Sequence, residues 1–314
     1  MSRAKGRKKV DVVDNNEGAA PNMDWISAVQ AGDEDEIKKS VSATISNVLS
    51  KNGLQRYTTL FLFDDCNSIS NYHADRIYRA ASKNRDDGKD ILLILQSAGG
   101  SIEPAYLISK TLKRLAKEKF SVAIPRRAKS AATLISLGAD EIHMGLMSQL
   151  GPIDPQFGGL PALALGNALD VIAELTSRFP TASDMLSKYL TDNLSPRTLG
   201  YFQRVSESAV QYAERLLTSK GLPNGKTPHQ VADHLVNHYK DHGFVIDIDE
   251  SRELLGSGMI KDGTPEYLAA DELFDFLDFF SFTLRYFQGK RFYLVGDVTG
   301  GLNFVPLETD KSSA

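Results

Sequence analysis

Apolar residues in the first half of the chain follow two patterns in turn. The segment 58–63 (TTLFLF) predicts a strand that ends in acidic turn residues, and the continuous apolar run at 90–95 (DILLIL) is typical of a strand that is buried on both faces of a parallel sheet. Between these segments, Ala74, Ile77 and Ala81 recur at helical spacing. The alternation predicts strand–helix–strand units and therefore an α/β fold with a mostly parallel sheet.

The alternation continues through two further units. The helix after 90–95 is expected to bury Ile108, Leu112 and Leu115. The segments that follow predict a strand, a helix and a strand: KFSVAIP (119–125), KSAATLISLGA (129–139) and DEIHM (140–144). In such sheets ligands bind at the carboxyl ends of the strands. The loops after the strands are therefore where functional residues are expected.

The rest of the chain divides into regions of different character. A Gly/Pro-rich crossing at 149–166 leads to helices, the clearest at 196–217, and 272–287 is heavily aromatic and precedes a strand-like stretch at 290–298. The expected organisation has four parts: a disordered N-terminal arm (1–33), an N-terminal helix (34–56), the α/β domain (57–260) and an aromatic-rich, helical C-terminal extension (261–314).

Composition narrows the classes of function. The 314 residues are 42% hydrophobic and 24% charged, as in ordinary globular proteins, and the net charge of −4 does not favour nucleic-acid binding. No apolar run is long enough to span a bilayer, and no signal peptide is visible. The single cysteine, Cys66, fits a reducing cytoplasm. The basic stretch MSRAKGRKK (1–9) is either a solvated tail or an arm for an acidic partner.

Two segments carry candidate chemistry. In LQSAGGSIEPAYLIS (95–109), a buried strand runs into Gly99 and Gly100, which can bring backbone N–H groups close to a ligand. Neither GxxxxGK[ST] nor GxGxxG is present, so a nucleotide loop is not indicated. In the second segment (126–142) Ser130 opens a helix of small residues. Taken alone, Ser130 is either a helix cap or a nucleophile beside the free N–H of Ala131.

Three segments taken together resemble the Clp protease/crotonase superfamily: QSAGGSIEPAYLIS (96–109), AKSAATLISLGADEIHM (128–144) and LGPIDPQ (150–156). Within it, the chain is most similar to the serine dehydrogenase proteinase family, relatives of the signal peptide peptidases. The likeness covers roughly residues 57–260, with a looser match at 241–256. It implies a Clp/crotonase-like fold.

The resemblance also implies site residues. Ser130 would be the nucleophile of a serine peptidase, and the N–H groups of Ala131 and of the Gly99–Gly100 turn would form its oxyanion hole. An extended peptide substrate would add as a strand along the edge that follows the turn.

The general base is less well defined, because the sequence departs from the relatives' patterns. No lysine lies between Ser130 and Lys188, and Asp154 stands where Clp proteases carry a histidine. His143 is expected to point away from the site. The preferred network is Ser130, Asp154 and His242, with His242 as the base.

Several alternatives remain open for these polar residues. Lys188 could serve as the base, and Asp154 could instead brace its Gly/Pro turn. Asp247 is a weaker candidate to orient the base. His234, His238 and His242 would share one helix face, which can build a metal site, but an exposed polar stripe is favoured and no cofactor or metal is expected.

The leading hypothesis is an ATP-independent, cytoplasmic serine endopeptidase that cleaves peptides or unfolded proteins through an acyl-enzyme at Ser130. The alternatives are a crotonase-like acyl-CoA enzyme and an inactive relative that binds peptides or acts as a scaffold. No membrane span and no nucleic-acid partner are expected. A homo-oligomer is expected, both from the superfamily and from the aromatic residues of 272–287.

Overall fold

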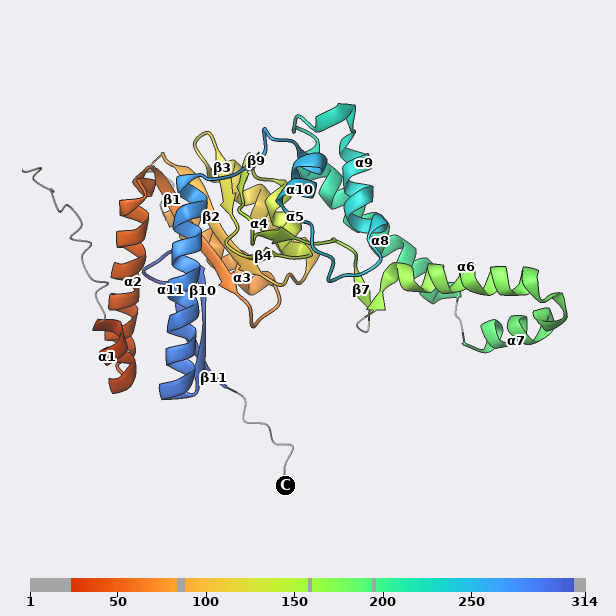
Figure 1. Cartoon of the computed structure of the whole chain (residues 1–314), viewed down its shortest axis with the longest axis horizontal. Helices are drawn as coiled ribbons and strands as arrows, with labels where there is room; N and C mark the ends of the chain where they lie inside the picture. Colours follow the sequence, from red (N-terminus) through yellow and green to blue (C-terminus); the bar gives the residue numbers. More distant parts are fainter. Residues whose placement is uncertain (1–23, 84–87, 158–159, 194–195, 308–314) are drawn as a thin grey trace, which may run out of the picture.

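The computed structural model describes residues 24–83, 88–157, 160–193 and 196–307 (Figure 1). Within these residues the main sheet has nine strands, in the order β11-β10-β1-β2-β3-β5-β9, with β4 pairing with β2 and with β6. The strands are β1 (Tyr57–Asp64), β2 (Asp90–Ser97), β3 (Phe120–Ala123), β4 (Arg127–Ala128), β5 (Glu141–His143), β6 (Gln149–Leu150), β9 (Ile260–Lys261), β10 (Lys290–Gly296) and β11 (Leu302–Pro306). A separate short hairpin joins β7 (Gln156–Phe157) to β8 (Leu160–Pro161).

The pairing of the strands confirms the expected mostly parallel α/β fold. The strands β1, β2, β3, β5 and β9 are parallel, whereas β10 and β11 are antiparallel and extend the sheet beyond β1. The α-helices are α1 (Asp24–Ala31), α2 (Glu34–Lys51), α3 (Asn71–Lys83), α4 (Ile102–Leu115), α5 (Ala131–Leu137), α6 (Ala162–Arg178), α7 (Ser183–Asn193), α8 (Pro196–Leu217), α9 (Pro228–Asp233), α10 (Ile248–Leu255) and α11 (Pro265–Gln288). Among the described residues, none of these helices is both long and apolar enough to cross a bilayer.

Helices cover both faces of the sheet, and the central strands supply one hydrophobic core to each face. Along β1, Leu60 and Leu62 join the core formed with α3, α4, α5 and α8, while Phe61 and Phe63 join the core formed with α1, α2 and α11. Successive side chains of a strand point to opposite faces, so a strand buried on both sides reads as a continuous apolar run. This is why the sequence showed no alternation in 58–63.

The described segments nearest the two termini are more closely built into the fold than the sequence suggested. Helix α1 lies within the segment expected to be a disordered arm, and its Trp25 packs edge-on against the rings of Phe276, Phe279 and Phe280 in α11. Strand β10 pairs directly with β1, so the C-terminal segment contributes strands to the main sheet in addition to the expected helix. The basic stretch 1–9 lies outside the described residues.

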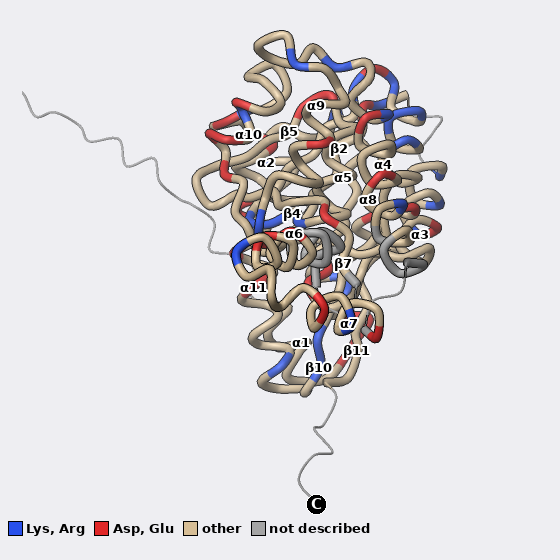
Figure 2. Tube along the Cα trace, turned by 90° about the vertical axis from the view of Figure 1, so that its right-hand side faces the viewer, with Lys and Arg blue, Asp and Glu red and all other residues tan. Residues whose placement is uncertain are grey.

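The surface shows a projecting arm and a mixed distribution of charges. Helices α6 and α7 project away from the sheet as an arm, and α8 leads back to it (Figure 1). Lys and Arg are interspersed with Asp and Glu along the chain trace (Figure 2). The arm was not foreseen, although its helices fall where the sequence placed helices after the Gly/Pro crossing.

Candidate active site

Ser130 lies at the start of α5 in a strained backbone conformation. Its φ and ψ are 51° and −118°, a region that non-glycine residues rarely enter and that costs on the order of 1–3 kcal/mol. Its side chain makes no capping hydrogen bond with the helix. Ser130 therefore occupies the N-cap position without capping the helix through its side chain, and its hydroxyl is free to meet another group.

Hydrogen bonds on both sides hold this turn in place. The N–H of Lys129 donates to Ser97 O at the end of β2 (3.1 Å). The hydroxyl of Thr133, fully buried in α5, lies 2.7 Å from Ala128 O and accepts the N–H of Gly151 at 3.0 Å. The serine turn is thus fixed to the sheet and to the crossing segment at once.

The Gly99–Gly100 turn packs directly against Ser130. Both glycines have positive φ, 107° and 153°. A Cβ on Gly99 would stand 2.8 Å from Ser130 Cβ, and one on Gly100 would stand 2.2 Å from Ile69 N. No side chain fits at either position without displacing backbone, which is the physical reason for glycine at both.

The two glycine N–H groups are used differently. The N–H of Gly99 donates to Ser97 Oγ at 3.2 Å. Ile69 bonds on either side of Gly100, accepting from Ser101 N (2.8 Å) and donating to Gly99 O (2.9 Å). In such a parallel bridge the N–H of the middle residue, Gly100, points away from Ile69.

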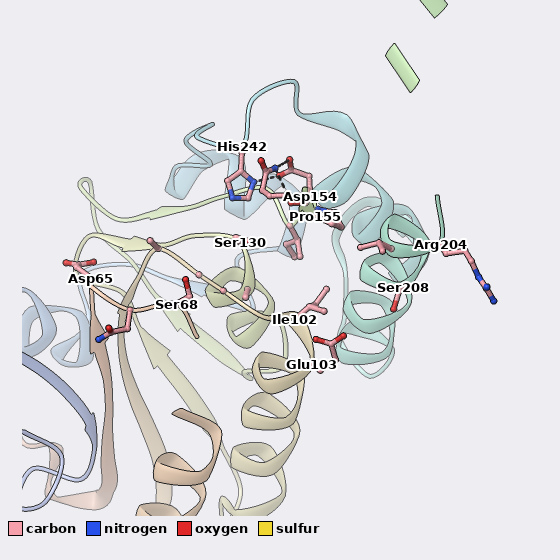
Figure 3. Close-up of a pocket in the computed structure, with 18 of the residues that line it drawn as sticks. Asp65, Ser68, Ile102, Glu103, Ser130, Asp154, Pro155, Arg204, Ser208 and His242 are labelled. Carbon is pink, nitrogen blue, oxygen red and sulfur yellow. Dashed lines mark hydrogen bonds and ion pairs between the residues drawn. The ribbon is translucent and has the colours of Figure 1, made fainter. Parts of the chain in front are cut away.

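A cavity of about 750 Å³ opens over the turn and Ser130 (Figure 3). The sequence-predicted residues that line it are Gly99, Gly100, Ser130, Ala131, Asp154 and His242. The cavity therefore brings together, from four separate segments, all six predicted site residues.

His242 and Asp154 form a close pair in this cavity (Figure 3). His242 Nδ1 lies 2.7 Å from Asp154 Oδ1, and the other carboxylate oxygen accepts from Gln156 Nε2, also at 2.7 Å. Asp154 is 4% exposed, whereas the side chain of His242 is 32% exposed. With Nδ1–H donating to the carboxylate, Nε2 carries the lone pair and is available as a base. The described chain shows no direct hydrogen bond between His242 and Ser130, and such bonds often form only when substrate is bound.

Lys129, directly before the serine, braces the segments that carry this pair. Its ammonium group donates to Leu150 O (3.1 Å), at the end of β6 four residues before Asp154, and to Phe244 O (2.8 Å), in the loop that holds His242. Burial, and secondly the nearby charge of Arg127, lowers the pKa of Lys129. Both bonds direct its nitrogen to main-chain carbonyls, so the side chain links three parts of the site.

The other candidates lie elsewhere. Lys188 is exposed on α7, and Asp247 caps α10 by accepting the N–H groups of Asp249 and Glu250. His143 is buried and bonds Thr264 Oγ1 at 2.8 Å, as expected for a side chain that points away from the site, and burial lowers its pKa. None of these three lines the cavity within the described chain.

The row of histidines does not share one helix face. The helix from Pro228 changes to π-helical geometry over His234–His238 and ends there, so His242 lies in the loop beyond it. The rings of His234 and His238 stack with centroids 4.1 Å apart. Within the described residues, no group of three or more His, Cys, Asp or Glu side chains is placed to hold a metal ion.

Sequence reasoning missed two walls of the cavity. One is the loop after β1, with Asp65, Cys66, Asn67 and Ser68; the other is one side of α8, with Tyr201, Arg204, Val205 and Ser208. The first had a usable signal, since the loop leaves the carboxyl end of a central strand. The second had none, because only the folding of the chain after the projecting arm brings α8 over the site.

Part of this chain is similar to a known protein family. Residues 29–174 match the family model of ClpP-like SDH-type serine proteinases. The matched segment contains the serine turn, the glycine turn and Asp154, while the loop with His242 lies beyond it.

Two similar proteins of Methanocaldococcus jannaschii are uncharacterized. One (MJ0137) is 41% identical over 95 residues, 30% of this chain and 32% of its own length; the other (MJ1495) is 38% identical over 92 residues, 29% and 31%. The match thus spans about a third of these curated relatives.

The solved structures that match at low identity include two proteases. An S97A mutant of the 1510-N membrane-bound stomatin-specific protease has 13% identity and a TM-score of 0.40, covering 77% of this chain and 91% of that one. ClpP1 from Listeria monocytogenes has 12% identity and a TM-score of 0.42, covering 70% and 99%.

Proposed function

We propose that the protein is a serine endopeptidase that cleaves peptide bonds through an acyl-enzyme at Ser130. The observation that carries the proposal is the uncapped, strained serine in a cavity that it shares with a His–Asp pair. A serine becomes nucleophilic when a base removes its proton, and the base needs a third group to fix its tautomer. The match to the ClpP-like SDH-type serine proteinases supports the same reaction.

The reaction begins with attack of Ser130 Oγ on the substrate carbonyl carbon. The serine proton passes to His242 Nε2, while Asp154 holds Nδ1–H and stabilises the imidazolium. The carbonyl oxygen becomes an oxyanion, which accepts hydrogen bonds from the N–H groups of Gly100 and Ala131. The N–H of Gly99 already donates to Ser97 Oγ, so Gly99 contributes in another way: its missing side chain lets the turn pack closely against Ser130.

The second half of the reaction reverses these roles. The tetrahedral intermediate collapses, the C–N bond breaks, and His242 gives its proton to the leaving amine. A water molecule then loses a proton to His242 and attacks the ester carbonyl carbon. As the C–O bond to Ser130 breaks, His242 returns that proton to Ser130 Oγ and the new carboxylic acid is released. No step requires a nucleotide, so added ATP is expected to leave the rate unchanged.

The test uses a fluorophosphonate probe on the full chain. We expect the probe to label Ser130 in the wild type and to leave Ser130→Ala unlabelled, with casein hydrolysis lost in parallel. His242→Gln should lower the rate about 1,000-fold or more, because the base is removed. Lys188→Ala is the matched control and should retain full activity, since that side chain is exposed on α7.

Two outcomes would contradict the proposal. Casein hydrolysis at the wild-type rate by Ser130→Ala would place the chemistry elsewhere. A well-folded wild type that binds peptides but reacts with no probe would instead favour a peptide-binding relative without catalysis.

We further propose that copies of the chain associate through α11. Phe279, Phe282, Tyr286 and Phe287 are exposed on this helix, whereas Phe280 is buried in the core. Sedimentation velocity should show a species larger than the 34.5 kDa monomer, which Phe282→Lys should dissociate. A wild type that is monomeric at micromolar concentration would contradict this proposal.

A further inference from the structure

A buried polar group lies beside the cavity, between the end of β1 and the start of α3. Asp64 is 1% exposed and His73 is 3% exposed. His73 Nδ1 accepts the N–H of Ser70 at 3.1 Å and lies 3.0 Å from Ser70 Oγ, while Nε2 is 3.2 Å from Asp64 Oδ2. Because a backbone amide can only donate, Nδ1 is the unprotonated nitrogen and Nε2–H donates to the carboxylate.

This group is not a second catalytic triad, although it contains Ser, His and Asp. The lone pair of His73 Nδ1 is already occupied by a backbone N–H. The ring is buried, and neither Ser70, His73 nor Asp64 is among the described residues that line the cavity. Its role must therefore be exerted through the residues that it holds.

Asp64 organises the loop that forms one wall of the cavity. Its Oδ1 accepts the N–H groups of Cys66 (2.9 Å) and Asn67 (2.8 Å), and the side-chain amide of Asn67 bonds the carboxylate as well. Burial alone would raise the pKa of Asp64, but the bonds from His73, Asn67 and Cys66 together hold it below its ordinary value. The carboxylate is thus ionised, and its bonds are charge-assisted.

The same group reaches the glycine turn through Ile69. This residue lies between the loop held by Asp64 and Ser70, which is held by His73. Ile69 N donates to Gly99 O at 2.9 Å, and Ile69 O accepts from Ser101 N at 2.8 Å. These two bonds bracket Gly100 and determine the direction in which its N–H points.

We propose that Asp64 and His73 are positioning residues for the oxyanion hole. They fix Ile69 from both sides along the chain, and Ile69 in turn sets the orientation of the Gly100 N–H. The inference rests on the proposed peptidase function for its catalytic consequence, but not for the structural linkage. A misplacement of about 1 Å in such a donor can lower the rate about 100-fold.

Two substitutions separate the two halves of the network. His73→Asn keeps an acceptor for the Ser70 N–H but cannot reach Asp64, whereas His73→Gln keeps a donor for Asp64 but leaves no acceptor at the position of Nδ1. We expect each variant to lower kcat about 10- to 100-fold. KM should stay within about twofold of the wild type, since His73 does not line the cavity. His229→Gln is the matched control: this histidine is exposed, pairs with Glu214, and should change neither constant.

Amide hydrogen exchange tests the linkage without depending on activity. The amides of Ile69 and Ser101 should exchange at least 10-fold faster in both His73 variants, relative to the amides of Leu62 and Leu93 in the central strands. The central amides report global stability, so this ratio removes any general destabilisation.

The outcomes keep the two proposals distinguishable. An unchanged ratio in both variants, or an equal loss of protection throughout the sheet, would overturn the positioning role. Faster local exchange with wild-type kcat would also overturn it, because the turn would then move without consequence. If the wild type itself is unreactive, the proposed peptidase function fails, and the exchange ratio alone decides whether the network holds the turn.

Discussion

Replacing Gly100 with alanine is expected to lower kcat about 100- to 1,000-fold, the usual effect of losing one oxyanion donor. The new methyl group would stand 2.2 Å from Ile69 N and 2.6 Å from Ile69 O, so the backbone around Ile69 or around Gly100 must move. Either movement turns the Gly100 N–H away from its present direction. The same collision should lower the free energy of unfolding by about 2–3 kcal/mol. Peptide hydrolysis and denaturant unfolding measure the two effects.

A variant at a second glycine, Gly53, measures the effect of positive φ alone, without a steric collision. Gly53 has φ +70° and no atom within 4 Å of its missing Cβ. Gly53→Ala should therefore lower the free energy of unfolding by about 1 kcal/mol and leave kcat unchanged. Wild-type kcat in Gly100→Ala would show that this turn takes no part in the reaction.

Replacing Ser130 with glycine is expected to abolish hydrolysis and to raise stability. Glycine adopts φ 51° and ψ −118° without the strain that serine bears there. The relief of about 1–3 kcal/mol exceeds the entropy that glycine adds to the unfolded chain, about 0.4–1 kcal/mol. A net gain of about 1 kcal/mol should follow. Ser130→Ala, which loses no capping bond, should unfold at nearly the wild-type denaturant concentration.

Thr227 provides the matched comparison, because it is an ordinary capping residue. Its φ is −83° and its hydroxyl accepts the N–H of Gln230. Thr227→Gly should lower stability by a few tenths of a kcal/mol and Thr227→Ala by about 1 kcal/mol. If both Ser130 variants are instead less stable than the wild type, as both Thr227 variants should be, the serine is not strained and the free-hydroxyl argument for the active site is lost.

The sheet and the glycine and serine turns were predictable because they depend on short segments. An apolar run such as 90–95 is long enough for one strand only, and the spacing of Ile108 and Leu112 defines one face of a helix. Glycine pairs and a serine before alanines mark turns through local backbone preferences. Each of these signals is complete within about fifteen residues.

The state of Ser130 could not be decided in this way. A serine that caps a helix and one that leaves its hydroxyl free can have the same neighbours in sequence. The two differ in the backbone angle φ. That angle depends on packing against Gly99 and on the bond from Lys129 N to Ser97 O, which comes from another strand. The same holds for His242, which i, i+4 spacing placed on a helix that in fact ends at His238.

The sequence by itself therefore determined the α/β fold and proposed the residues of the site, because main-chain preferences and apolar periodicity are local. Only the tertiary structure decided that Asp154 and His242, 88 residues apart, lie 2.7 Å from each other. It also decided that Ser130 makes no side-chain capping bond to α5. Contacts of this kind arise when separate strands and loops pack at one edge of the sheet. The residues around Asp154 therefore do not indicate that His242 is its partner, and the residues around His242 do not indicate Asp154.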